Sequence, residues 1–439
     1  MTLPHGVLRG VATSAWQIEG ATREGGRGPS IWDRFARRPG AIRTGETGDK
    51  ACDHYHRWRE DIALIADLGC DAYRFSVAWP RIQPEGRGRP NPDGLDFYDR
   101  LVDGLAEAGI APVVCLYHWD LPEALQDRGG WTNRETVPRF AEYAWRVADR
   151  LGDRVSTFFM MNEANIHARL GHLIGVHAPG VVRPDAFLRA MHHQTQATAE
   201  AMRALDEESR DWRLGTILSL APVSPGDDSQ SAEEAAHRLD SWWNGAGLDP
   251  LVHGRYPEAI AETMDSVIDH DAYDLERMHR PPDVIGVNYY HPLYARPDRD
   301  APLGLAVAEA APGAQETTAM GWGIEPDRLE AMLLRLKADY GDPALMVTET
   351  GAAFDDRPDA EGRIRDPRRI AFLESHLDAI ARAIDGGAKV EGVFVWSLLD
   401  NVEWAEGTAK RFGLVHVDFE TQTRTPKDSY RWLQEQWRG

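Results

Sequence analysis

The sequence of 439 residues predicts an α/β fold, a single (β/α)8 TIM barrel with extended βα loops. Three observations predict it. Eight short apolar runs recur along the chain, and segments with helical spacing of apolar residues separate them. The first run also lacks the G-x-G-x-x-G loop that a doubly wound open sheet normally carries. No segment resembles a linker, so we expect one catalytic domain over residues 1–439.

The eight apolar runs each have four to seven residues, the length of a buried parallel strand. They are Val7–Thr13, Ala72–Ser76, Ala111–Leu116, Thr157–Met161, Leu214–Leu218, Val284–Val287, Leu345–Thr348 and Gly392–Trp396. Between them, apolar residues fall at three- and four-residue intervals, which predicts amphipathic helices. These segments are Glu60–Leu68, Leu95–Ala108, Glu135–Leu151, Phe187–Leu205, Pro326–Tyr340 and Ile370–Asp385.

The chain is longer than the ~250 residues typical of a (β/α)8 barrel, so loop insertions are needed. Three segments are rich in proline, glycine and charge and lack apolar periodicity: Ser224–Ala236, Arg296–Thr318 and Asp355–Pro367. We expect irregular insertions there.

Charge and composition exclude several classes of protein. The 49 basic and 70 acidic residues give a net charge of −21, which would repel nucleic acid and an anionic membrane surface. No run approaches the ~20 apolar residues of a membrane span. The three cysteines are too few for a disulfide framework, and the N-terminus lacks a signal-peptide pattern. These features predict a cytoplasmic protein that binds neither nucleic acid nor membrane.

In such a barrel, functional residues lie at the carboxyl ends of the strands. The predicted strand ends carry polar groups that could bind hydroxyls, Glu403 among them, a pair of further glutamates and several indoles. In chain order they are Gln17, Arg74, His118, Trp119, Asn162, Glu163, Asn288, Tyr290, Glu349, Trp396, Asn401, Glu403 and Trp404. We expect them around one mouth of the barrel.

Two glutamates at these ends indicate a particular chemistry. Glu163 and Glu349 follow the fourth and seventh strands, which lie on roughly opposite sides of the ring, so they can face each other across a substrate. Cleavage of a glycosidic bond needs such a pair, one carboxylic acid to protonate the leaving oxygen and one carboxylate to attack the sugar. The chemistry requires no metal and no organic cofactor. We interpret the H-x-H pair His54 and His56 as structural, because no other ligands converge on it.

Several motifs give the sequence a resemblance to a known family. They are Gly10–Gly20, Tyr73–Ser76, Trp79–Arg81, Tyr117–Pro122, Ile285–Tyr290, Met320–Trp322, Trp396–Trp404 and Arg411–Asp418. In this order and spacing the sequence resembles glycoside hydrolase family 1, the β-glucosidase family, over nearly its whole length.

The resemblance implies a retaining, exo-acting β-glycosidase that removes terminal β-D-glucosyl residues, with β-galactosides or β-fucosides as further substrates. Glu163 would be the acid/base and Glu349 the nucleophile, with carboxyl groups roughly 5–5.5 Å apart. The charge of Glu349 would raise the pKa of Glu163 and keep it protonated at neutral pH.

The resemblance also assigns the binding residues. The non-reducing sugar would be held by Gln17, His118, Trp119, Asn162, Glu403 and Trp404. Trp396 would stack under the sugar, and Trp322 would line the aglycone side. Tyr290 and Arg74 would hold the nucleophile in position. Tyr290 is also one of the expected substrate-binding residues. The predicted partner is a small β-glycoside or oligosaccharide, and a homo-oligomer is left open.

The sequence departs from the family pattern near both glutamates. Met160-Met-Asn-Glu-Ala164 stands where the family usually reads T-x-N-E-P, and Asn165 where tryptophan is common. Thr350 and Ser219 replace frequent asparagines. These changes bear on aglycone preference and rate. They leave two alternatives open: an enzyme that mainly transfers glycosyl groups to alcohols, and a catalytically impaired sugar-binding barrel.

Overall fold

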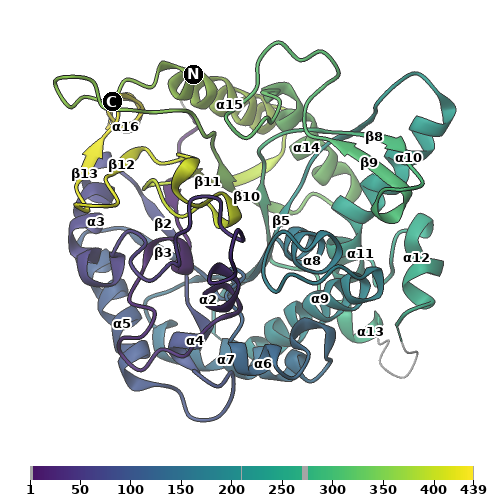
Figure 1. Cartoon of the computed structure of the whole chain (residues 1–439), viewed down its shortest axis with the longest axis horizontal. Coiled ribbons are helices and arrows are strands. Elements are labelled where there is room, and N and C mark those ends of the chain that lie inside the picture. Colours follow the sequence, from purple (N-terminus) through teal and green to yellow (C-terminus); the bar gives the residue numbers. More distant parts are fainter. Residues whose placement is uncertain (1–2, 209, 269–274, 439) are drawn as a thin grey trace.

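Eight parallel strands form a closed barrel at the centre of the molecule (Figure 1). The computed structural model describes residues 3–208, 210–268 and 275–438, so the other positions of the predicted domain lie outside the described residues. The strands are β1 (Leu8–Ala12), β2 (Ala72–Ser76), β3 (Ala111–Cys115), β4 (Thr157–Asn162), β5 (Arg213–Ser219), β7 (Val284–Asn288), β10 (Ala344–Thr350) and β11 (Lys389–Trp396). They follow one another in chain order, and β11 pairs with β1. The predicted fold class is therefore confirmed.

The strands are apolar on both sides because each side packs against a core. β2 and β4 are buried along their whole length. A small cluster that includes Val113, Phe159 and Phe394 fills the barrel, and a larger one lies between strands and helices. A Cβ at Gly10 would lie 2.6 Å from the ring of Phe394, so only glycine fits there.

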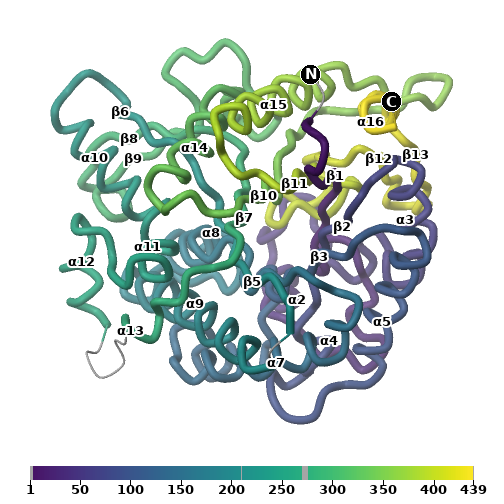
Figure 2. The backbone as a smooth tube through the Cα atoms, turned by 180° about the vertical axis from the view of Figure 1, so that it is seen from behind, coloured from purple at the N-terminus to yellow at the C-terminus, as the bar shows by residue number. Residues whose placement is uncertain are grey.

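Six long helices cover the outside of the barrel, as the sequence predicts (Figure 2). They are α3 (His54–Leu68), α5 (Pro92–Glu107), α7 (Thr136–Leu151), α9 (Pro184–Asp206), α14 (Pro326–Asp339) and α15 (Pro367–Asp385). Several begin before the predicted residue. Pro92, Pro184 and Pro367 stand at the helix starts, where proline costs no hydrogen bond.

Further short elements lie outside the predicted helices and strands. The helices of this kind are α1 (Ala15–Ile18), α2 (Ile31–Ala36), α4 (Trp79–Ile82), α6 (Glu123–Gln126), α8 (Ala164–Ala168), α11 (Ala246–Val252), α12 (Glu258–Asp265), α13 (Leu275–Met278) and α16 (Asp428–Arg438). One-turn and π-helical segments are η1 (Gly130–Thr132), η2 (Arg169–Ile174), η3 (Ser241–Gly245), η4 (Pro302–Gly304) and η5 (Trp404–Ala409). Strands β12 (Val415–Val417) and β13 (Arg424–Pro426) pair antiparallel.

Two of the three predicted irregular insertions are in fact structured. Ser224–Ala236 contains the end of β6 (Val223–Pro225) and the start of α10 (Gln230–Asp240), and Arg296–Thr318 contains the end of β8 (Leu293–Pro297) and all of β9 (Leu305–Ala308). β6, β8 and β9 form a small sheet beside the barrel (Figure 2). The prediction was wrong there because such short strands are held by backbone pairing and leave no apolar period.

Candidate active site

The residues at the carboxyl ends of the strands surround one cavity of about 330 Å³. Nine of the predicted site residues line it: His118, Trp119, Glu163, Tyr290, Trp322, Glu349, Trp396, Glu403 and Trp404. Gln17, Arg74 and Asn162 lie just behind this wall, where each is hydrogen-bonded to a residue that lines the cavity. The barrel thus brings the whole predicted set together.

Glu349, near the end of β10, is held by two donors. Its Oε1 accepts from Nη1 of the fully buried Arg74, and its Oε2 accepts from the Tyr290 hydroxyl at 2.6 Å. Arg74 comes from β2 and Tyr290 follows β7, so three strands fix this carboxylate. A charge-assisted contact to a buried guanidinium stabilises the ionised carboxylate.

Glu163 stands directly after β4 with a left-handed backbone, at φ 48°. A non-glycine residue in this region is uncommon and points the side chain out of the strand direction. The carboxyl Oε1 accepts from Asn288 Nδ2 at 2.8 Å. Burial, and then the charge of Glu349, raise the pKa of Glu163 to about 8. Sequence reasoning named only the Glu349 charge, whereas burial is the larger cause.

Asn288, the last residue of β7, connects the two glutamates, a role that the sequence analysis missed. Its Nδ2 donates to Glu163 and, at 3.1 Å, to Asn162 Oδ1. The same Asn162 oxygen accepts from Arg74 Nη2 at 2.7 Å, and Arg74 binds Glu349. An unbroken chain of hydrogen bonds therefore runs from one carboxyl group to the other.

Glu403 also lines the cavity and is hydrogen-bonded to Gln17. Gln17 Nε2 is within 3.4 Å of Glu403 Oε2 and also donates to Asn401 Oδ1 at 3.1 Å. Burial and the charge of Glu349 raise the pKa of Glu403 to about 8, so at neutral pH this carboxyl group is mostly protonated. It can then both donate and accept a hydrogen bond.

Flat aromatic faces form much of the same end of the cavity. The His118 ring lies 5.9 Å from that of Trp396 and 5.8 Å from that of Trp404, nearly parallel to both. Behind Trp404, the Trp16 ring stacks at 5.7 Å. Trp119 donates its indole N–H to the Asn162 carbonyl at 2.9 Å. Burial and the nearby Arg74 lower the pKa of His118, which keeps this ring neutral.

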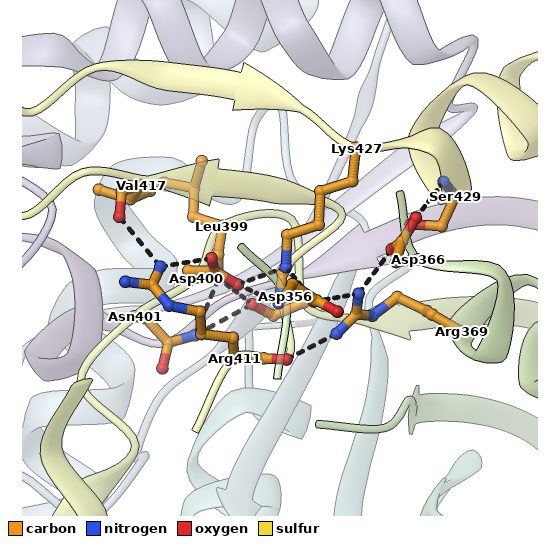
Figure 3. Close-up of polar contacts among 12 residues, drawn as sticks. Asp356, Asp366, Arg369, Leu399, Asp400, Asn401, Arg411, Val417, Lys427 and Ser429 are labelled. Carbon is orange, nitrogen blue, oxygen red and sulfur yellow. Dashed lines mark hydrogen bonds and ion pairs between the residues drawn. The ribbon is translucent and has the colours of Figure 1, made fainter. Parts of the chain in front are cut away.

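A buried ionic network supports the segment that carries Glu403 (Figure 3). Lys427 Nζ lies between two carboxylates, 2.7 Å from Asp356 and 2.8 Å from Asp400. Arg369 binds Asp356 from the other side. Asp400 follows β11 and precedes Asn401, so this network fixes the start of the loop that leads to Glu403.

The opposite end of the cavity contains residues that the sequence analysis did not assign. Trp322 donates to Glu309 Oε2 at 3.0 Å, and its ring lies 4.8 Å from that of His291. The Arg169 guanidinium lies over the Trp243 ring, 5.2 Å from its centre. Glu309 follows β9, and Arg169 and Trp243 lie in η2 and η3, so no barrel strand end marks these three residues. His291 comes soon after β7.

The candidate histidines outside the cavity are bound to carboxylates. His54 Nδ1 lies 2.8 Å from Asp61, and His56 contacts Asp53 and Glu24. In the part of the chain that the structure describes, no group of three or more His, Cys, Asp or Glu side chains could hold a metal ion. Within the same residues, no helix combines the length and apolar character that crossing a bilayer requires.

Comparisons with known proteins agree with this geometry. The chain is 43% identical to beta-glucosidase A of Thermotoga maritima over 98% of this chain and 96% of that protein. It is 44% identical to a bifunctional beta-D-glucosidase/beta-D-fucosidase of Bifidobacterium breve, over 98% and 97%. The solved structure of a Thermotoga maritima beta-glucosidase in complex with deoxynojirimycin superposes with a TM-score of 0.94 at 42% identity, over 99% and 98% of the two chains.

The family model described as glycosyl hydrolase family 1 matches residues 1–438. The match covers the barrel, the cavity and both glutamates. The chain therefore belongs to glycosyl hydrolase family 1 and is a glycoside hydrolase.

Proposed function

We propose that the protein is a retaining, exo-acting β-glucosidase that hydrolyses terminal non-reducing β-D-glucosyl residues and accepts β-fucosides and β-galactosides as further substrates. One observation carries the proposal: Glu163 and Glu349 line the same cavity in opposite electrostatic settings. The pKa of Glu163 is raised, whereas the Glu349 carboxylate is bound by the Arg74 guanidinium. The relatives named beta-glucosidase, one of them also a beta-fucosidase, support the choice of sugar.

In the first step, Glu163 gives its proton to the glycosidic oxygen as the bond from that oxygen to the sugar C1 breaks. A Glu349 oxygen forms a bond to C1 in the same step, which leaves a glycosyl ester and releases the aglycone alcohol. A pKa of about 8 supports this role for Glu163, because the carboxyl group is then protonated at neutral pH. Arg74 and Tyr290 orient the attacking carboxylate.

In the second step, Glu163 accepts a proton from water, whose oxygen attacks C1 and releases Glu349. Ester formation removes the negative charge of Glu349, which is one of the two main causes that raise the pKa of Glu163. Glu163 therefore becomes a better base when the step requires it. The separation of roughly 5–5.5 Å expected for a retaining pair stays a prediction.

The glucosyl unit itself would lie against the Trp396 face, with its hydroxyls toward Gln17, His118 and Glu403. These side chains already share hydrogen bonds with neighbours, so they are preorganised for a polar ligand. Trp404, backed by Trp16, lines the same cavity, and we expect it to limit the site to a single terminal sugar.

The test compares the wild type with Glu349→Gly and Glu163→Ala on 4-nitrophenyl β-D-glucoside, β-D-fucoside and β-D-galactoside. Both variants should lose about three or more orders of magnitude in kcat/KM. Azide should restore turnover of Glu163→Ala and give the β-glycosyl azide. Glu374→Ala, an exposed glutamate on α15, is the control that should leave turnover unchanged.

Undiminished turnover in either cavity variant would refute the assigned roles. Product analysis with added alcohol separates hydrolysis from the alternative of glycosyl transfer. Sugar binding without turnover of any glycoside would instead support an impaired sugar-binding barrel. The cytoplasmic location and a homo-oligomer stay predictions from the sequence.

A further inference from the structure

A second cavity, of about 310 Å³, adjoins the active-site cavity. The two cavities share two wall residues, Arg169 and Trp243, and Asn165 lines the second cavity alone. The rest of the second wall is almost wholly apolar and includes Leu173, Phe187, Leu239, Trp242, Leu305 and Val307. Arg169 is the single charged residue among the described residues that line it. The volume of this second cavity is within the range of small-molecule sites, ~300–1,000 Å³.

The walls of this lateral cavity are firmly packed. Phe187 on α9, Leu239 on α10 and Trp242 on η3 are each at least nine-tenths buried. The rings of Phe187 and Trp242 lie 5.7 Å apart. The opposite wall is formed by η4 and β9, part of the small sheet beside the barrel. The cavity is therefore a preformed apolar space between helices and a sheet.

Arg169 and Trp243 form the junction between the two cavities, and Asn165 lies beside Trp243 in the wall of the lateral cavity. Asn165 Nδ2 donates to the Ser219 and Trp243 carbonyls at 2.8 and 2.9 Å, which fixes this short side chain in the wall. Its Oδ1 is buried and has no hydrogen-bond partner within the described residues. The Arg169 side chain rests on the Trp243 ring and is attracted by the charge of Glu309, but its guanidinium forms no hydrogen bond or close ion pair with the described residues. The side chain can therefore turn aside without breaking a hydrogen bond.

We propose that the lateral cavity receives the apolar tail of the aglycone, so that the enzyme acts on alkyl and other amphipathic β-glucosides. The proposal rests on the proposed function and names the substrate class of the same site. An oligosaccharide aglycone would need donors and acceptors along its whole length, but beyond Asn165 and Arg169 the lateral wall is apolar, so burying sugar hydroxyls there would be unfavourable. An alkyl chain would instead remove apolar surface from water on both sides.

The experiment measures kcat/KM for methyl, butyl and octyl β-D-glucosides and for cellobiose. Each fully buried methylene is worth about fourfold in affinity, so the wild type should favour octyl over methyl glucoside by ~10-fold or more. Ala306, half-buried on β9, lines the lateral cavity and not the active site. Ala306→Phe should fill the cavity and reduce the octyl-to-methyl ratio to within about twofold of one, with methyl glucoside turnover unchanged.

Ala308→Phe is the matched control, because Ala308 is exposed on the same strand and lines neither cavity. It should keep the wild-type ratio. A ratio near one in the wild type, or the same ratio in both variants, would overturn the proposal. Ala306→Glu, which places a charge in the wall, should reproduce the loss if the phenylalanine variant folds poorly.

Failure of the proposed function gives a different result. If no glucoside is hydrolysed, binding of octyl β-D-glucoside by calorimetry still tests the cavity. Weaker binding in Ala306→Phe than in Ala308→Phe would then support the lateral site without a β-glucosidase, and equal binding would refute it.

Discussion

The two ends of the active-site cavity differ in how their side chains are held. At the end around Glu403, called here the sugar end, Gln17, Arg74 and Asn162 each make several buried hydrogen bonds. At the end around Trp322, called here the aglycone end, Arg169 lies over an indole ring and near the charge of Glu309, and its side chain forms no hydrogen bond with the described residues. Under the proposed function, we expect the sugar end to bind one fixed ligand, whereas the aglycone end should select more by shape and ring contact.

Substitution at the sugar end should therefore impair catalysis, and Arg74→Met is the strongest case. Arg74 binds both Glu349 and Asn162, so its loss would release the carboxylate and the amide together. We expect kcat on 4-nitrophenyl β-D-glucoside to fall by about 10²–10³-fold, the usual loss when a buried electrostatic contact at a reacting group is removed. Steady-state kinetics measure it.

Arg9→Met is the matched control, because Arg9 lies on the neighbouring strand β1 in a half-exposed pair with Asp71. Its kcat should stay within about twofold of the wild type. If Arg74→Met behaved like the control, the sugar end would not depend on its hydrogen-bond network, and the contrast between the two ends would be wrong.

The pH dependence tests the same end through Glu163. Burial and the Glu349 charge raise the pKa of Glu163 from 4.5 to about 8, so the proton needed for the first step is present below that pH and lost above it. We expect kcat/KM to fall about tenfold for each pH unit above 8. The profile of the free enzyme on an aryl glucoside measures it.

The control for this pH limb is Glu163→Ala with azide, which should lose the alkaline decline assigned to Glu163. An unchanged decline in that variant would assign it to another group, and Glu403, with a pKa also raised to about 8, is the first to examine.

Lys427→Met separates support of the sugar end from its chemistry. Lys427 is fully buried between Asp356 and Asp400, so its removal leaves two buried carboxylates with fewer partners (Figure 3). We expect the free energy of unfolding to fall by about 3–5 kcal/mol in urea titrations. Because Asp400 precedes the loop to Glu403, KM for the glucoside should rise as well.

Lys389→Met serves as the comparison, since Lys389 is 57% exposed in its pair with Asp342. An exposed pair contributes ~0–1 kcal/mol, so this variant should unfold almost like the wild type. Equal destabilisation of both variants would mean that the buried network adds nothing specific.

The sequence predicted the sugar end far better than the aglycone end, for a physical reason. Glu163, Glu349 and Trp396 stand at the ends of apolar runs, and a closed parallel barrel necessarily gathers such ends. Asn288 occupies a position of the same kind, but its link to Glu163 depends on how the ends of β7 and β4, the two strands that flank β5, are directed toward each other. That geometry has no local sequence pattern.

At the aglycone end the sequence carries less information. Glu309 follows β9, which lies within an insertion predicted as irregular, and Arg169 begins the π-helical turn η2. Neither position follows from apolar periodicity, because short strands and a single wide turn are held by backbone bonds and by the neighbours on which they pack. The lateral cavity depends on these same elements.

The smallest effect is expected at the aglycone end itself, with Trp322→Ala. The Trp322 ring contacts Tyr290 at 5.3 Å and Phe412 at 6.0 Å, but it lies outside the chain of hydrogen bonds between the glutamates. Loss of one aromatic contact is worth ~0.5–1.5 kcal/mol, so kcat/KM on an aryl glucoside should fall by about three- to tenfold. On methyl glucoside, which has no ring to stack, it should change less than about twofold. An equal loss on both substrates would show that Trp322 serves the reacting groups, and that the two ends are one continuous network.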